Sequence, residues 1–143
     1  MSTERVCTLV LDEITLAVPV DRVAEVLLDQ DAVPVPRAHP CVVGMFNLRG
    51  EVVTAVDLRR RLDLPARPDG AAVVHVIVRV DGEPMSLVVD REGEVLDVDP
   101  DAWTEIPHTV GAPIRGLTAG AQRVGDDLLL LLDPDGALAL TAP

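Results

Sequence analysis

Hydrophobic and polar residues alternate in short blocks along the chain, and turn-forming residues separate these blocks. Residues 6–11 and 14–18 form two such blocks on either side of Asp12-Glu13, which predicts an N-terminal β-hairpin. Repeated short blocks of period two, each closed by a turn, are typical of an all-β sandwich or barrel. We therefore expect a mainly β fold.

Residues 73–80 carry the clearest alternation in the sequence. His75 and Arg79 share one face of the expected strand, and the other face carries Val74, Val76, Val78 and Val80. Because a strand sends successive side chains to opposite faces, the valine face is predicted to lie in the core and the other face to be at least partly wet.

Turn residues predict two further hairpins. Asp81-Gly82 is typical of a two-residue type I′ turn, so residues 85–90 are expected to return as a strand, with Pro84 at its start or on an edge. Gly125-Asp126 is expected to lead into a buried strand at residues 128–132. These segments add to the strand-rich character of both halves of the chain.

Helical patterns are scarce. Asp57 is a good N-cap for a short helix that contains Leu58 and Leu62 and ends before Pro65, since its carboxylate can accept from free backbone N–H groups. A weaker helical turn is predicted to begin near Asp21, with one face formed by Val20, Val23 and Leu27. We expect one or two short helices in all.

Residues 65–70, which include two prolines, are the most linker-like part of the chain. They separate two halves of similar size, each with enough strands for a small barrel. We expect residues 1–143 to form a single domain with an approximate internal division near 65–70, and strands are free to cross between the halves.

The net charge of the chain limits the classes of partner that it can bind. Twelve basic residues, all of them arginine, stand against 24 acidic residues and give a formal net charge of −12. Such a charge repels phosphate backbones and anionic lipids, so we expect no nucleic-acid partner and no membrane insertion. Without a signal-like N-terminal segment, a cytoplasmic location is predicted.

Residues suited to catalysis or metal binding are few. Neither serine, Ser2 or Ser86, stands in a nucleophile-elbow motif. The three histidines are too far apart in sequence to suggest a preorganised metal pair; they are His39, His75 and His108. Cys7 and Cys41 are expected to be small buried hydrophobes. We predict no catalytic residue, no metal and no cofactor.

One constellation stands out at residues 44–50, which read Gly-Met-Phe-Asn-Leu-Arg-Gly. Gly44 and Gly50 permit unusual backbone angles at a tight entry into a strand. Asn47, the only asparagine, tolerates left-handed conformations and bonds local backbone, and Arg49 offers a rigid fork for a carboxylate. By themselves, these features also fit an ordinary loop with a surface arginine.

The longer stretch GMFNLRGEVVTAVDLRRRL resembles the central signature of CheW-like domains. In that family a glycine, Asn-Leu-Arg-Gly and a strand ending in Val-Asp-Leu-Arg occur in this order. LAVPVDRVAEVL resembles an early family segment, SLVVDREGEVLDVDP a later strand and bend, and RVGDDLLLLLD the final hairpin. Four motifs in the same order are far more specific than any one of them.

This resemblance implies two small five-stranded SH3-like β-barrels, side by side and sharing a hydrophobic seam. It also implies a non-catalytic adaptor that couples chemoreceptors to a CheA-type histidine kinase. The expected partners are the regulatory domain of that kinase and the cytoplasmic tip of a chemoreceptor.

By motif position, the resemblance implies six partner-binding residues: Val23, Glu25, Gly44, Asn47, Arg49 and Gly50. Arg49 matches the signature arginine, and Glu25 matches the upstream acid with which it is expected to pair. Thr54 departs from the proline common in the family, and the sequence does not indicate what the arginines at 59–61 contact.

Two alternatives remain open at this point. A protein of the same fold could serve twitching, gliding or developmental signalling instead of chemotaxis. A small-molecule-binding β-barrel, or a hydrolase that uses Ser86 or a carboxylate pair, belongs to a different functional class and would require a deep polar pocket around those residues.

Overall fold

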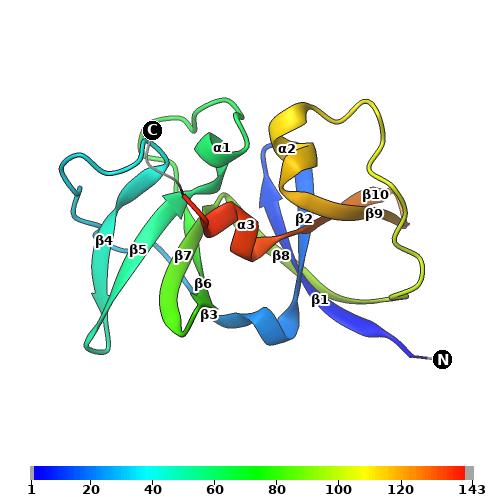
Figure 1. Ribbon diagram of the computed structural model, residues 1–143, viewed down its shortest axis with the longest axis horizontal. Coiled ribbons are helices and arrows are strands. Elements are labelled where there is room, and N and C mark those ends of the chain that lie inside the picture. The colour runs from blue at the N-terminus through cyan, green and yellow to red at the C-terminus, as the bar shows by residue number, and fades with distance from the viewer. Residues whose placement is uncertain (1, 141–143) are drawn as a thin grey trace.

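The computed structural model describes residues 2–140 and contains two five-stranded sheets that lie side by side (Figure 1). The first sheet, which we call the first barrel, has the strand order β8 (Arg91–Val98), β1 (Glu4–Leu11), β2 (Ile14–Pro19), β10 (Asp127–Leu132), β9 (Thr118–Val124). Its neighbours are antiparallel except for β2 and β10, which pair in parallel.

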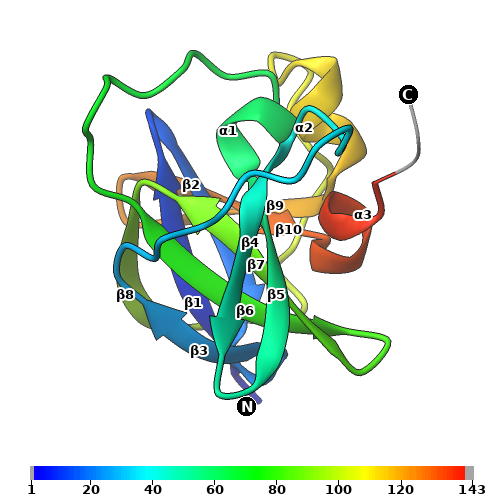
Figure 2. The same cartoon turned by 90° about the vertical axis from the view of Figure 1, so that its left-hand side faces the viewer.

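The second sheet, the second barrel, repeats this arrangement. Its strand order is β3 (Val23–Leu27), β6 (Val74–Val80), β7 (Glu83–Val89), β5 (Glu51–Asp57), β4 (Val42–Leu48). Here too one inner pair, β5 with β7, is parallel. Figure 2 views this barrel from its outer side and shows the strands wrapping around a common axis. The expected pair of SH3-like barrels is therefore confirmed.

Three hydrophobic clusters fill the part of the chain that the structure describes. One lies inside the first barrel and contains Val6, Ala17, Val98 and Leu129. Another lies inside the second barrel and contains Phe46, Val53, Ala55, Ile77 and Val88. The largest is the shared seam, to which strands of both barrels contribute. Its buried residues include Leu9 and Leu16 from the first barrel and Val76 and Leu87 from the second. Burial of apolar side chains on both faces of the inner strands holds the two barrels together.

The two faces predicted for residues 73–80 are confirmed. The valines of β6 face the seam, and the opposite face is wet only in part, at Arg79. His75 is 2% exposed and Arg79 is exposed, because His75 points into the second barrel while Arg79 lies at the end of that barrel. Alternation identified the two faces correctly, but it could not show that a barrel closes over the second one.

The three predicted hairpins are confirmed. They connect β1 to β2, β6 to β7 and β9 to β10. Their turns contain residues with positive φ: Asp12 at 53°, Asp81 at 52°, Gly82 at 81° and Gly125 at 59°. Aspartate and glycine adopt this left-handed region more readily than other residues, which is why the turns could be located from sequence.

The division between the barrels differs from the one expected near residues 65–70. The chain leaves the first barrel after β2, builds all of the second barrel, and returns with β8. Residues 65–70 therefore lie in a connection within the second barrel, between α1 (Leu58–Arg61) and β6. Their prolines mark a surface loop, and a loop composition alone does not distinguish a turn inside a unit from a boundary between units.

Within residues 2–140 there are three short α-helices, whereas the sequence predicted one or two. In α1, the Asp57 carboxylate caps the helix by accepting from the Arg59 N–H at 3.0 Å, as expected. The helical turn predicted near Asp21 is present as a single 3₁₀ turn, η1 (Val20–Arg22), but its face does not extend to Leu27, because β3 follows directly. The two helices not predicted are α2 (Ala112–Gly116) and α3 (Pro134–Leu138).

Candidate functional site

The Asn-Leu-Arg-Gly segment forms the turn between β4 and β5. Arg49 and Gly50 have φ values of 51° and 86°, and the flanking Leu48 and Glu51 pair across the hairpin. Two successive residues with positive φ are characteristic of a type I′ turn. The Asn47 side-chain oxygen accepts from the Gly50 N–H at 3.0 Å, so Asn47 fixes the turn from the end of the strand, while Arg49 and Gly50 adopt the left-handed conformation.

Arg49 reaches from this turn to Glu25 on β3, and its two terminal nitrogens each donate to one carboxylate oxygen at 2.5 Å. β3 and β4 are the two edge strands of the second sheet. The ion pair therefore joins opposite edges of that sheet and closes one end of the barrel. The hydrogen bonds from Arg49 lower the pKa of the Glu25 carboxyl below its ordinary value, because they favour its ionised form.

The pair lies on the surface, with 71% of the Arg49 side chain and 26% of the Glu25 side chain exposed. An exposed ion pair contributes little to stability, because water already solvates both charges well. Its main effect is to hold a planar guanidinium in one orientation at the surface. Such a group is available to contact a partner.

A second ion pair stands beside the first. Arg79 on β6 bonds the Glu51 carboxylate at 2.7 Å and the Gly82 carbonyl at 2.6 Å. Both pairs border one small depression, whose walls also include Ala24, Leu48, Ile77 and Pro84. This end of the second barrel is thus a charged surface of fixed geometry with a small apolar floor.

Gly44 lies apart from this turn, in β4, five residues and roughly 16 Å along an extended strand from Arg49. It is buried and its φ is not positive, so the expected unusual backbone angle is absent. The position instead requires close approach: a Cβ on Gly44 would lie 2.5 Å from the Val33 carbonyl oxygen. Val33 exchanges two backbone hydrogen bonds with Met45 and so covers the edge of β4.

Val23 is half-buried and packs against the shared seam. The pairing of β3 with β6 shifts by one residue between Val23 and Glu25. Of the six residues that the resemblance indicated, the structure therefore brings four together at one turn: Glu25, Asn47, Arg49 and Gly50. Val23 borders the seam and Gly44 supports the Val33 contact.

An apolar surface on the outer side of β4 and β5 was not predicted from the sequence. Val33, Met45 and Val52 are 67%, 36% and 60% exposed. They lie close together because Val33 pairs with Met45, and Val52 pairs with Asn47. The alternation of side chains along β5 could have predicted it, because Val52 and the buried Val53 must point to opposite faces of the strand. An exposed group of apolar side chains is typical of a protein-binding surface.

A second concave surface, the junction groove, lies between η1, β9, β10 and α3. Its lining includes Pro19, Arg22, Thr118, Leu131, Leu132 and Pro134. Arg22 bonds both carboxylate oxygens of Asp135 at one side of the groove. The walls thus combine apolar surface from the first barrel with a fixed ion pair.

The residues considered for a hydrolase do not form an accessible catalytic site. The Ser86 hydroxyl does contact a histidine, His75 Nδ1, at 2.9 Å, but Ser86 is 0% and His75 2% exposed. Both lie inside the second barrel with Phe46, whose ring meets the His75 ring edge-on at 5.1 Å. A nucleophile enclosed in this way has no room for a substrate carbonyl. We interpret the pair as a satisfied polar contact within the core.

Within residues 2–140, no group of three or more His, Cys, Asp or Glu side chains is placed to hold a metal ion. In the same part of the chain, no helix is both long and apolar enough to cross a bilayer.

Comparison with known proteins supports the family suggested by the motifs. The CheW-like domain model matches residues 5–141. The chain is 27% identical over 130 residues to chemotaxis protein CheW of Treponema pallidum (strain Nichols), covering 88% of this chain and 76% of that protein. It is 28% identical over 127 residues to chemotaxis protein CheW of Thermotoga maritima, covering 87% and 81%.

The fold comparison agrees. The crystal structure of scaffolding protein TtCheW from Thermoanaerobacter tengcongensis matches with a TM-score of 0.87 at 20% identity, covering 99% of this chain and 97% of that chain. At this identity the match shows a common fold. Because the family model spans nearly all of the sequence and its signature falls on the turn described above, the chain belongs to the CheW-like domain family.

Proposed function

We propose that the chain is a non-catalytic, cytoplasmic adaptor that couples chemoreceptors to a CheA-type histidine kinase. One observation carries this proposal: the family's signature arginine, Arg49, is held at the surface by Glu25 and joins the two edges of the second barrel. A rigid, exposed recognition group on a closed barrel suits a docking role. The names of the relatives favour chemotaxis over twitching, gliding or developmental signalling.

The receptor contact is assigned to the charged end of the second barrel. Glu25, Asn47, Arg49 and Gly50 form its fixed part, and Val23 and Gly44 keep β3 and β4 in place around it. The tip of a receptor is expected to bring polar side chains that complement Arg49 and apolar side chains that fill the depression beside it.

The kinase contact is assigned to the outer face of β4 and β5, where Val33, Met45 and Val52 are exposed. The expected partner is the regulatory domain of the kinase, which the family resemblance describes as a similar barrel. Contact between two such barrels would bury this apolar surface inside a polar rim, as in many protein interfaces.

The test is capture of purified receptor and kinase fragments by the wild-type chain and by Glu25→Ala and Arg49→Ala. We expect both variants to fold and to bind receptor on the order of tenfold more weakly, which corresponds to about 1.4 kcal/mol of binding free energy. Arg5→Ala is the matched control, because it removes a comparably exposed ion pair, with Asp97, from the first barrel. Undiminished capture by both variants would remove these residues from the site, and no capture by the wild type would refute the function.

A further inference from the structure

The three consecutive arginines of α1 contact three separate parts of the molecule. Arg59 donates to the Asp90 carboxylate, with its Nε 2.9 Å from Oδ1. Arg60 donates to the Pro40 carbonyl at 3.1 Å. Arg61 donates to the carbonyls of Gly136 and Ala137 in α3, at 3.1 and 3.0 Å. A helix of one turn thus connects its own barrel to two distant segments.

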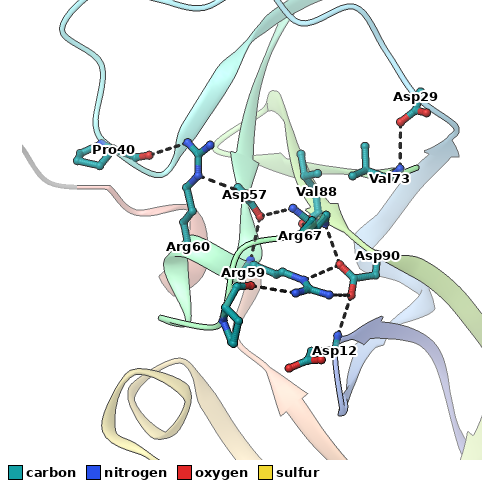
Figure 3. A network of polar contacts seen from close by, with 11 residues as sticks. Asp12, Asp29, Pro40, Asp57, Arg59, Arg60, Arg67, Val73, Val88 and Asp90 are labelled. Atoms are coloured by element: carbon teal, nitrogen blue, oxygen red, sulfur yellow. Dashed lines mark hydrogen bonds and ion pairs between the residues drawn. The ribbon is translucent and has the colours of Figure 1, made fainter. Parts of the chain in front are cut away.

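Asp90 lies where the chain returns from the second barrel to the first, between β7 and β8. Besides Arg59, its carboxylate accepts from Arg67 Nε at 2.8 Å and from the Asp12 backbone N–H at 2.7 Å (Figure 3). Asp12 belongs to the β1–β2 turn of the first barrel, whereas Arg59 and Arg67 belong to the second. One carboxylate therefore binds both barrels at once.

α3 makes the second connection. It follows β10 of the first barrel and lies in front of the junction in Figure 1. Arg61 of the second barrel donates to its carbonyls, and Arg22, in the turn that joins β2 to β3, pairs with Asp135 at 2.7 Å. Charged contacts thus cross between the barrels at two places, one at Asp90 and one at α3.

These contacts differ in kind from the seam. The seam is aliphatic, and apolar attraction is proportional to buried area and has little directional preference. A guanidinium that donates two hydrogen bonds to one carboxylate fixes both distance and angle. The side chains of Arg59, Arg67 and Asp90 are only 11%, 11% and 20% exposed, so water competes weakly for these bonds.

We propose that Arg59, Arg61 and Arg67, with Asp90 and α3, form an inter-barrel clamp that fixes the relative orientation of the two barrels, while the seam and the barrel interiors maintain the fold of each. The clamp is a property of the isolated chain and does not depend on the proposed partners. In an adaptor, such a clamp would hold docking faces on different barrels at a constant angle.

The test measures the distance between spin labels on the two barrels by pulsed electron paramagnetic resonance. Labels are attached to cysteines at the exposed positions Val52 and Val95, and the buried Cys7 and Cys41 are replaced by alanine. The clamp variants are Arg59→Lys and Asp90→Asn; lysine keeps the charge but loses the two-pronged bond. Hydrogen exchange of strand amides reports the fold of each barrel separately.

We expect both clamp variants to broaden the distance distribution. Protection of the strand amides should fall only by the loss of global stability, and equally in the two barrels. Arg79→Lys is the matched control, because it loses the equivalent bond to Glu51 within one barrel, and it should leave the distribution unchanged. An unchanged distribution in Arg59→Lys overturns the proposal. A loss of strand protection in that variant that is confined to one barrel also overturns it, because the network would then maintain the fold of that barrel and not the angle between the two.

Discussion

Asp90 shows how strongly a single side chain can depend on its surroundings. Partial burial of its carboxyl favours the protonated form, but the hydrogen bonds from Arg59 and the Asp12 N–H and the charge of Arg67 outweigh that effect. The result is a pKa lowered from 3.8 to about 2. Because the Asp90 side chain is only 20% exposed, this shift corresponds to about 2 kcal/mol of stability at neutral pH.

Replacement of Asp90 by asparagine should therefore lower the free energy of unfolding at pH 7 by about 2 kcal/mol, as measured by urea denaturation. The carboxylate stabilises the fold fully above its unfolded pKa of 3.8, and this contribution is lost as the pH falls toward about 2. The gap between variant and wild type should narrow over that window. Asp97→Asn, at an exposed ion pair, is the control, and an equal loss in both variants would contradict the assignment.

His75 should make stability sensitive to mild acid. Burial lowers the pKa of its imidazole from 6.5, the nearby Asp29 charge opposes this effect and the Arg67 charge adds to it. Because the folded pKa lies below the unfolded one, stability is complete above pH 6.5 and falls as the pH drops below it. His75→Gln, which can still bond Ser86, should reduce the fall of the urea midpoint between pH 7.5 and pH 5. If the midpoint of this variant falls as steeply with pH as that of the wild type, groups other than His75 cause the pH dependence.

At the scale of single elements, local signals predicted structure well where neighbours in sequence are also neighbours in space. Asp81-Gly82 and Gly125-Asp126 predicted their hairpins because the turn residues themselves determine the backbone. The helix α3 was missed although Asp133 caps it through the Gly136 N–H and proline follows. The same Asp-Pro pair ends a strand equally well, so the signal was ambiguous.

Gly44 and Gly50 illustrate two different requirements for glycine within one hairpin. A Cβ at Gly44 would meet the Val33 backbone at 2.5 Å, whereas at Gly50 no atom lies within 4 Å but φ is 86°. Gly44→Ala should therefore displace the segment around Val33 from β4 and cost about 2 kcal/mol. Gly50→Ala should cost about 1 kcal/mol through backbone strain alone.

Thermal denaturation measures both losses, and hydrogen exchange at Met45 distinguishes them. The Met45 N–H bonds the Val33 carbonyl, so its protection should fall in Gly44→Ala and persist in Gly50→Ala. Equal protection of the Met45 N–H in the two variants would show that a Cβ at position 44 does not displace Val33 from β4. Close approach would then not be the reason for glycine at this position.

At the scale of the whole molecule, sequence patterns predicted the number of barrels but not the path of the chain between them. Arg67 contacts Asp57 and Asp90, 10 and 23 residues away, and Arg61 contacts α3 at 75 and 76 residues. No periodic pattern encodes such separations. The pairing of Glu25 with Arg49 was available only from the family resemblance, and the structure confirms the contact. The roles of arginines 59–61 emerged only from the tertiary structure.

The shared seam should make the two barrels unfold as one unit, because neither retains a complete core without the other. Leu129 lies inside the first barrel and is 1% exposed, and Leu129→Ala should cost about 2–5 kcal/mol, as is typical of a buried leucine. If unfolding is cooperative, amide protection must fall by the same free energy in β6 and β7 of the second barrel as in β1 and β2. Protection lost from the first barrel alone would show that the seam joins two units that fold independently, and the clamp at Asp90 would then be a connection between domains.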